Sequence, residues 1–328
     1  MNRSGDNGVT IRVKQFLALT GLAATELFRQ PACFLLVVCN VALTILLPLS
    51  VAHQLGQATH LAVDSSLAFE LVFGVILAGY AACATLHNEC RSGTILIVFS
   101  KPVSRLRFFL AKFAAVALVL AFFIYCSGMA AVLTERLAPR NFEFDSLGMN
   151  MLLATPLVAF LPAALLNFLT RRPFIPWALG LLALTLTAWV LVLGAYDGEG
   201  HRVIFGSTIA WPILPAAALE GLALMVMATL ALSLAGRLAT PATVSILTVM
   251  LFAGLIADHL VEQTASLPLI SAALRLILPD IQAFWPADRL AAGGVVTLPV
   301  LGHAALYSLA YGMGVLSLGY AAFRNRQF

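Results

Sequence analysis

Residues 108–133 read FFLAKFAAVALVLAFFIYCSGMAAVL, a run of 26 positions in which Lys112 is the only charged residue. An α-helix rises about 1.5 Å per residue, so this run is long enough to cross a hydrocarbon core of about 30 Å. Inside lipid, backbone polar groups must be satisfied within the segment, and a continuous run of this length achieves that only as a helix. The stretch therefore predicts a transmembrane helix.

Similar runs recur along the whole chain. Hydrophobic residues make up 61% of the sequence and the mean hydropathy is +0.96, against roughly 45–50% apolar residues in soluble domains. No run shows the ten-residue alternation of outer-membrane strands. The sequence predicts an all-α polytopic membrane protein, a single domain over 1–328, with eight spans at 32–52, 67–88, 108–133, 150–170, 177–196, 209–236, 241–258 and 300–322.

The distribution of cations predicts how the spans are oriented. If both termini are cytoplasmic, 14 of the 19 Lys and Arg residues fall on the inner side and 5 on the outer side. An excess of Lys and Arg in cytoplasmic loops is the orienting rule for membrane proteins. The net charge of +4 therefore reflects topology, and no nucleic-acid partner is expected.

Two shorter segments predict helices that lie at the membrane surface. In the first, 10–30, apolar residues recur at three-to-four spacing opposite a polar face. The second is Leu267–Leu278, within an extracytoplasmic segment at 259–299. It is too short to span, ends at Pro279, and predicts an interfacial or partly re-entrant helix.

The chain has no recognisable chemistry of its own. It contains neither GxxxxGK[ST] nor GxGxxG, so it has no phosphate-binding loop. The five cysteines lie in spans or on the inner side, and the six histidines are scattered. We expect no cofactor, no metal site and no enzymatic activity, so the energy for any ATP-driven process must come from another chain.

One segment concentrates charge, NECRSGTILIVFSKPVSRLRFFLAKF at Asn88–Phe113, with six charged residues in 26 positions. Its short apolar run Thr94–Phe99 lies between two turn signals, Gly93 and Pro102. On the predicted topology this run is cytoplasmic, too short to span and too apolar to lie free in water. It needs a membrane surface or a partner protein to cover it; the alternative is an ordinary inner loop.

This segment resembles the type-2 ABC exporter permeases, which carry a related pattern after their second span. The matching positions are Glu89, Gly93, Thr94, Ile95–Phe99, Pro102, Val103, Ser104, Arg105, Ala111 and Lys112. Ala111 stands where the pattern usually has glycine. Two C-terminal stretches, Ala228–Leu260 and Leu278–Leu290, are similar to permeases grouped with multicopper-enzyme maturation.

The resemblance implies a membrane-spanning permease subunit of an ABC exporter in the plasma membrane of a prokaryote. It further implies a separate ABC ATPase subunit that docks on a cytoplasmic coupling segment at 89–107, and a homodimer or heterodimer of permeases. The residues that would carry this ATPase coupling are Glu89, Gly93, Thr94, Pro102, Ser104 and Arg105.

Two carboxylates fall inside predicted spans, Glu220 near the middle of the sixth and Glu70 in the second. A charge at the centre of a bilayer helix costs roughly 2.5–3.5 kcal/mol on insertion scales, so such residues face protein or a water-filled path. Both are candidates for a translocation path. For Glu220 the alternative is a neutral or packed side chain, and for Glu70, near the outer end of its span, it is a side chain that reaches the membrane interface. They also support a different function, an ion-coupled secondary transporter, and a membrane-embedded assembly factor is a third alternative.

Overall fold

The structure is a computed structural model that describes residues 3–50, 58–92, 104–138, 145–264, 267–286, 290 and 294–324. These ranges contain helices and no β-strand, which confirms the all-α fold. Within them, seven helices are long and apolar enough to cross a membrane. They are α2 (Pro31–Ser50), α3 (Ala58–Ala82) with its continuation to Cys90, α6 (Arg105–Leu137), α7 (Ser146–Thr170), α8 (Phe174–Ala195), α9 (Ile213–Ala235) and α14 (Leu298–Arg324).

The predicted eighth full span, at 241–258, is wrong in length. Helix α10 covers Thr240–Leu255, and its 16 residues extend about 24 Å, short of a 30 Å core. It ends where the chain meets a distant segment, because the Ile281 N–H donates to the Gly254 carbonyl at 3.3 Å. A Cβ added at Gly254 would lie 2.6 Å from the Pro279 carbonyl oxygen. The shortening is therefore a tertiary effect that local hydropathy does not report.

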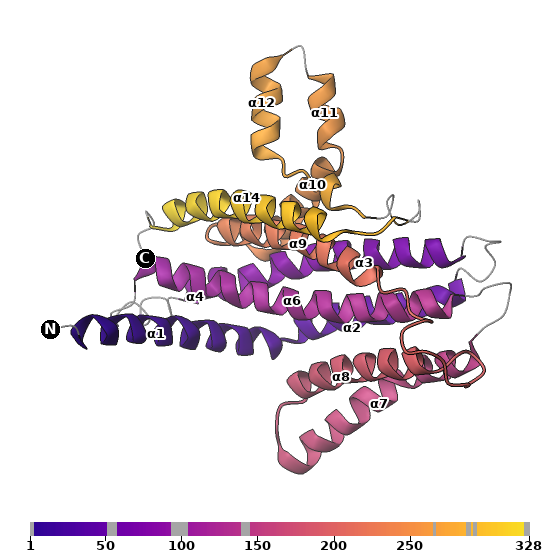
Figure 1. Cartoon of the computed structure of the whole chain (residues 1–328). Coiled ribbons are helices and arrows are strands. Elements are labelled where there is room, and N and C mark those ends of the chain that lie inside the picture. The colour runs from indigo at the N-terminus through magenta and orange to yellow at the C-terminus, as the bar shows by residue number, and fades with distance from the viewer. Residues whose placement is uncertain are drawn as a thin grey trace.

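Helices α3, α6 and α9 form the centre of the bundle, since each packs against the other two. Helices α1 (Arg3–Phe28) and α2 pack on α6, and α14 packs on α9. The α7–α8 hairpin lies to one side and is attached mainly through α8 (Figure 1). Small residues allow the central helices to approach closely; Gly128 of α6, for example, packs against Ala217 of α9.

The two segments predicted at the membrane surface are both helical. Helix α1 packs Ala24 and Leu27 into the bundle, whereas Val13 and Leu17 stay exposed, so it keeps an apolar outer side. Helix α12 (Pro268–Ile277) matches the predicted helix before Pro279 and stands beside α11 (Ala257–Gln263). This pair projects away from the bundle at a steep angle (Figure 1). Whether either segment lies at a bilayer surface stays a prediction.

Both chain ends lie at the same end of the bundle (Figure 1). There α1 begins, α4 (Asn88–Ser92) ends, α6 begins and α14 ends; we call this the basal end and its opposite the distal end. The side of the membrane on which the basal end lies stays a prediction.

Helix α3 reaches the basal end through a π-helical turn, η1 (Cys83–His87), that leads into α4. The Asn88 N–H donates to the Cys83 carbonyl, which is the i to i+5 bond of a π-helix. The Cys83 thiol lies 3.3 Å from the Thr243 hydroxyl of α10. The wider turn is thus packed against a neighbouring helix.

Candidate functional site

The first and last charged residues of the stretch Asn88–Phe113, Glu89 and Lys112, meet at the basal end. Lys112 Nζ of α6 donates to Glu89 Oε1 of α4 at 2.5 Å. The Lys112 side chain is 7% exposed and that of Glu89 is 21% exposed. Ion pairs removed from water in this way are strongly destabilised when one partner is lost. The pair therefore fixes the separation of the two helix ends from which residues 93–103 depart.

The second end of this segment is held by three further contacts. Ser104 is the N-cap of α6 and accepts a hydrogen bond from the Arg107 N–H. The Arg107 side chain donates to Gln15 Oε1 of α1 at 2.8 Å. The Arg105 side chain donates to the carbonyl oxygen of Arg324, in the last turn of α14, at 2.7 Å. The start of α6 is thus tied to both terminal helices.

An aromatic cluster packs beneath these polar contacts. Phe108 and Phe109 of α6 contact Phe323 of α14, with ring centroids 6.2 and 5.8 Å apart. Lys112 Nζ lies 5.3 Å from the Phe108 ring centroid, a cation–π distance. Aromatic pairs at these distances add about 0.5–1.5 kcal/mol beyond their buried area. The basal ends of α6 and α14 are therefore in direct contact through these rings.

Of the six predicted coupling residues, the structure describes Glu89 in α4 and Ser104 and Arg105 at the start of α6, each with a partner of its own: Lys112, the Arg107 N–H and the Arg324 carbonyl. Gly93, Thr94 and Pro102 lie outside the described residues. Glu89 has an intrachain partner, Lys112, which the sequence pattern contained without indicating the pairing. These contacts connect α4 and the start of α6 to one another and to α1 and α14.

Glu70 and Glu220 are both in the core. Each is 1% exposed, and among the described residues none of their four carboxylate oxygens has a hydrogen-bond partner. Glu70 lies on α3 and Glu220 on α9, two helices in direct contact. A groove of about 360 Å³ lies on another side of α9, where Leu222, Met225 and Thr229 meet α6 and α14. The carboxyl groups do not line that groove, so the buried carboxylate and the groove lie on different sides of α9.

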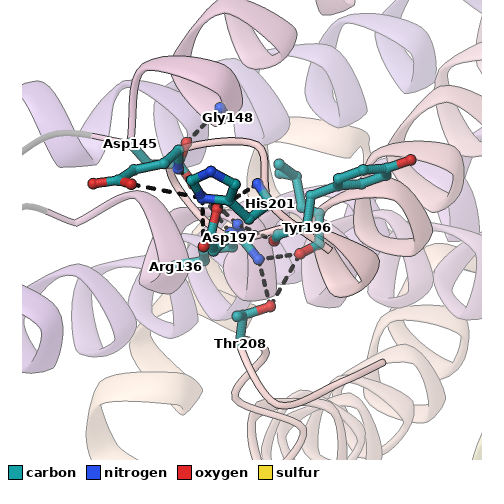
Figure 2. A network of polar contacts seen from close by, with 9 residues as sticks. Arg136, Asp145, Gly148, Tyr196, Asp197, His201 and Thr208 are labelled. Atoms are coloured by element: carbon teal, nitrogen blue, oxygen red, sulfur yellow. Dashed lines mark hydrogen bonds and ion pairs between the residues drawn. The ribbon is translucent and has the colours of Figure 1, made fainter. Parts of the chain in front are cut away.

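The distal end carries a buried arginine whose role sequence reasoning missed (Figure 2). Arg136, in the last turn of α6, pairs with Asp145 at 3.1 Å, and these side chains are 6% and 11% exposed. Its guanidinium also donates to the carbonyl oxygens of Leu193 and Tyr196 and to the Thr208 hydroxyl. Its acceptors thus come from the start of α7, the end of α8 and the chain leading to α9. The group fastens the α7–α8 hairpin to α6.

Asp145 is also the N-cap of α7, because its Oδ1 accepts from the Gly148 N–H at 2.8 Å. In the adjoining exposed turn, the His201 and Glu199 N–H groups donate to Asp197 and hold the pKa of that carboxyl below its ordinary value (Figure 2). The sequence analysis predicted the neighbouring span at 150–170 and gave Asp145 no role.

Within the described ranges, no group of three or more His, Cys, Asp or Glu side chains could hold a metal ion. The described contacts at both ends of the bundle hold helices together.

The family model described as "ABC-2 family transporter protein" matches residues 29–188. The match includes the whole of Glu89–Lys112, together with Glu70 and Arg136, and ends before Glu220. The similarity to permeases of multicopper-enzyme maturation, which rested on the C-terminal third, is not confirmed. No curated protein matches the chain.

Proposed function

Residues 29–188 belong to the ABC-2 family of transporter proteins, and from this premise we propose that the chain is an exporter permease driven by a separate ABC ATPase. The ATPase docks on residues 93–103 and on the helix ends that flank them. One observation carries this proposal: the basal ends of α1, α4, α6 and α14 are joined by contacts of Gln15, Glu89, Arg105 and Arg107.

The mechanism follows from these joints. Nucleotide-driven movement of the ATPase displaces 93–103, and the Glu89–Lys112 pair transmits that displacement to α3 and α6 together. Arg107 and Arg105 transmit it to α1 and α14. Because α3, α6 and α9 share one packed core, the central helices then move as a group and open a path for substrate.

The assembly contains two permease chains and two ATPases in a prokaryotic plasma membrane, with the basal end in the cytoplasm. The concentration of cations at the basal end supports this orientation. Arg105, Arg107 and Lys112 start α6, and Arg324 ends α14.

A photo-crosslinking amino acid placed within 93–103 tests the docking site. We expect it to capture a protein that carries a GxxxxGK[ST] loop, identified by mass spectrometry. The matched control is the same crosslinker at Glu199, an 84% exposed side chain in the turn after α8. Equal capture at both positions, or capture of no nucleotide-binding protein, would overturn the proposal.

Transport measured in vesicles distinguishes this function from ion-coupled secondary transport. An ABC permease requires ATP hydrolysis by its partner and loses flux when the partner's loop lysine is replaced. ATP-independent flux that follows an imposed proton gradient would identify the secondary transporter instead.

A further inference from the structure

The carboxyl groups of Glu70 and Glu220 lie at one level of the bundle. Helices α3 and α9 both run from the distal to the basal end, where Leu86 comes within 4.0 Å of a Cβ built on Gly236. Nearer the middle, the side chain of Leu224 packs directly on Gly74. Glu70 and Glu220 lie one helical turn from this contact toward the distal end, so the two residues face one another across the α3–α9 contact. Their carboxyl groups interact electrostatically.

Helix α6 closes this layer on a further side. Gly221 of α9 packs against Ile124 of α6, and Gly128 of α6 packs against Ala217 of α9. At the same level Asn40 of α2 donates to the Ser127 hydroxyl at 2.6 Å, but Asn40 Oδ1 receives no hydrogen bond. Three fully buried side chains in one layer thus present five oxygen atoms that lack a donor.

The packed helices offer no cation to this layer within the described part of the chain. On α6, Lys112 and Arg136 are paired at opposite ends of the helix. The described parts of α2, α9 and α10 contain no Lys, Arg or His. The remaining titratable groups on the described parts of these helices are Cys33 and Cys39 of α2, His60, Asp64, Tyr80, Cys83 and His87 of α3 and η1, Arg105, Arg107, Tyr125, Cys126 and Glu135 of α6, and His303, Tyr307, Tyr311, Tyr320 and Arg324 of α14. Of these, His303, Tyr307 and Tyr311 contact the carbonyl of Pro299, the N–H of Asp280 and the carbonyl of Ile277.

Asp64 links the pair to the distal end. It precedes Glu70 by six residues on α3, about 9 Å along the helix, and it is half-buried where Glu70 is fully buried. Its carboxyl interacts electrostatically with that of Glu220. The three groups therefore descend from the partly accessible end of α3 into the core.

We propose that Glu70 and Glu220 form a proton-binding pair that holds a proton at neutral pH and exchanges it with the distal side through Asp64. Two carboxylates side by side without a counter-ion cannot both be ionised in a low-dielectric core, whereas a pair that shares one proton can be accommodated. Uptake converts one carboxylate and one hydronium ion into a carboxylic acid and water. This site goes beyond the proposed function, because ATP-driven movement at the basal end does not require it.

Infrared spectroscopy on the purified chain in lipid nanodiscs tests the pair without any substrate or ATPase. We expect a carboxylic acid C=O band at neutral pH that disappears in Glu70→Gln/Glu220→Gln and is altered in each single variant. The matched control is Glu199→Gln, at the exposed turn, which should leave the band unchanged. Because glutamine is nearly isosteric with glutamate, we expect the variants to fold. If the double variant does not fold, the presence or absence of the band in the wild type still tests the proposal.

A second measurement identifies the residues and the ligand. Dicyclohexylcarbodiimide reacts with protonated carboxyl groups in apolar surroundings. Mass spectrometry should therefore find its adduct on Glu70 or Glu220, and the labelling should be lost in alkaline buffer. Asp64→Asn should slow the deuterium shift of the C=O band while leaving its size unchanged. An unaltered band in the double variant would overturn the proposal. So would protection from the carbodiimide by sodium ions at constant pH, because the pair would then hold a metal cation.

Discussion

Exchanging the charges of Glu89 and Lys112 tests whether their ion pair holds the coupling segment in place. Three variants are needed: Glu89→Lys, Lys112→Glu and the double exchange. Each single reversal sets two like charges about 2.5 Å apart in the place of the present pair. The double exchange restores opposite charges with their positions swapped.

The size of the effect follows from burial. Losing one partner of a fully buried pair costs about 3–5 kcal/mol. Lys112 is 7% and Glu89 21% exposed, so we place each single reversal near the lower limit, about 3 kcal/mol, or roughly two factors of ten in an equilibrium. The double exchange loses the contact between Lys112 and the Phe108 ring, worth about 0.5–1 kcal/mol. It should therefore fall within about 1 kcal/mol of the wild type.

Two assays separate structure from coupling. Thermal unfolding of the purified chain in nanodiscs reports the pair itself, and ATP hydrolysis by the co-expressed ATPase reports transmission. We expect both to fall in the single variants and both to recover in the double exchange, with Glu199→Lys as the exposed control. Additive losses, near 6 kcal/mol in the double exchange, would refute the reasoning, because the two residues would then act independently.

Three other predictions concern the rest of the bundle. Replacing Arg136 with Met leaves the buried Asp145 carboxylate without its cation and should lower the free energy of unfolding by about 3–5 kcal/mol. The unfolding temperature should fall while ATPase binding stays unchanged. An equal loss of ATPase binding would argue against a purely distal role. Gly254→Ala places a Cβ 2.6 Å from a backbone oxygen and should lower the free energy of unfolding by about 1–3 kcal/mol. The control Gly180→Ala places its Cβ where no atom lies within 4 Å and should not destabilise the protein. Similar unfolding temperatures for the two variants would contradict the close contact. Reporter fusions should report the outside at Gln57, Asn141, Glu199 and Thr264, and the inside at Ser100 and Gln327. Cytoplasmic signals at two or more of the four outer positions would overturn the topology.

The sequence predicts the helical spans well because each is a local property of about 20 consecutive apolar residues. It fails at α10, because that helix is ended by a contact between Gly254 and Ile281, and hydropathy does not report contacts between distant residues. The predicted helix before Pro279 was found because α12 ends at Ile277, just before that proline, and proline has no N–H with which to continue a helix; Pro48, Pro156 and Pro162 lie inside helices, so the rule holds only locally.

The candidate sites were predicted less completely. The charged pattern identified Glu89 and Lys112 separately, but their pairing depends on how α4 is rotated relative to α6. The insertion cost of a carboxylate marked Glu220 and Glu70 individually, and only the register between α3 and α9 reveals that they face one another. Arg136 was counted only as an outer cation, because its acceptors are carbonyl and hydroxyl groups from separate segments.

The π-helical turn at Cys83–His87 has a consequence for how the coupling end can evolve and move. Each residue of an α-helix turns the chain by about 100°, and a π-turn inserts one extra residue. Glu89 therefore points about 100° away from the direction that an unbroken α3 would give it. Deleting one residue from this turn would rotate Glu89 off Lys112 while leaving Glu70 and the buried side of α3 in their present orientation. The turn therefore sets the direction of Glu89 separately from that of Glu70, although its own residues Cys83 and Leu86 are buried and would have to repack.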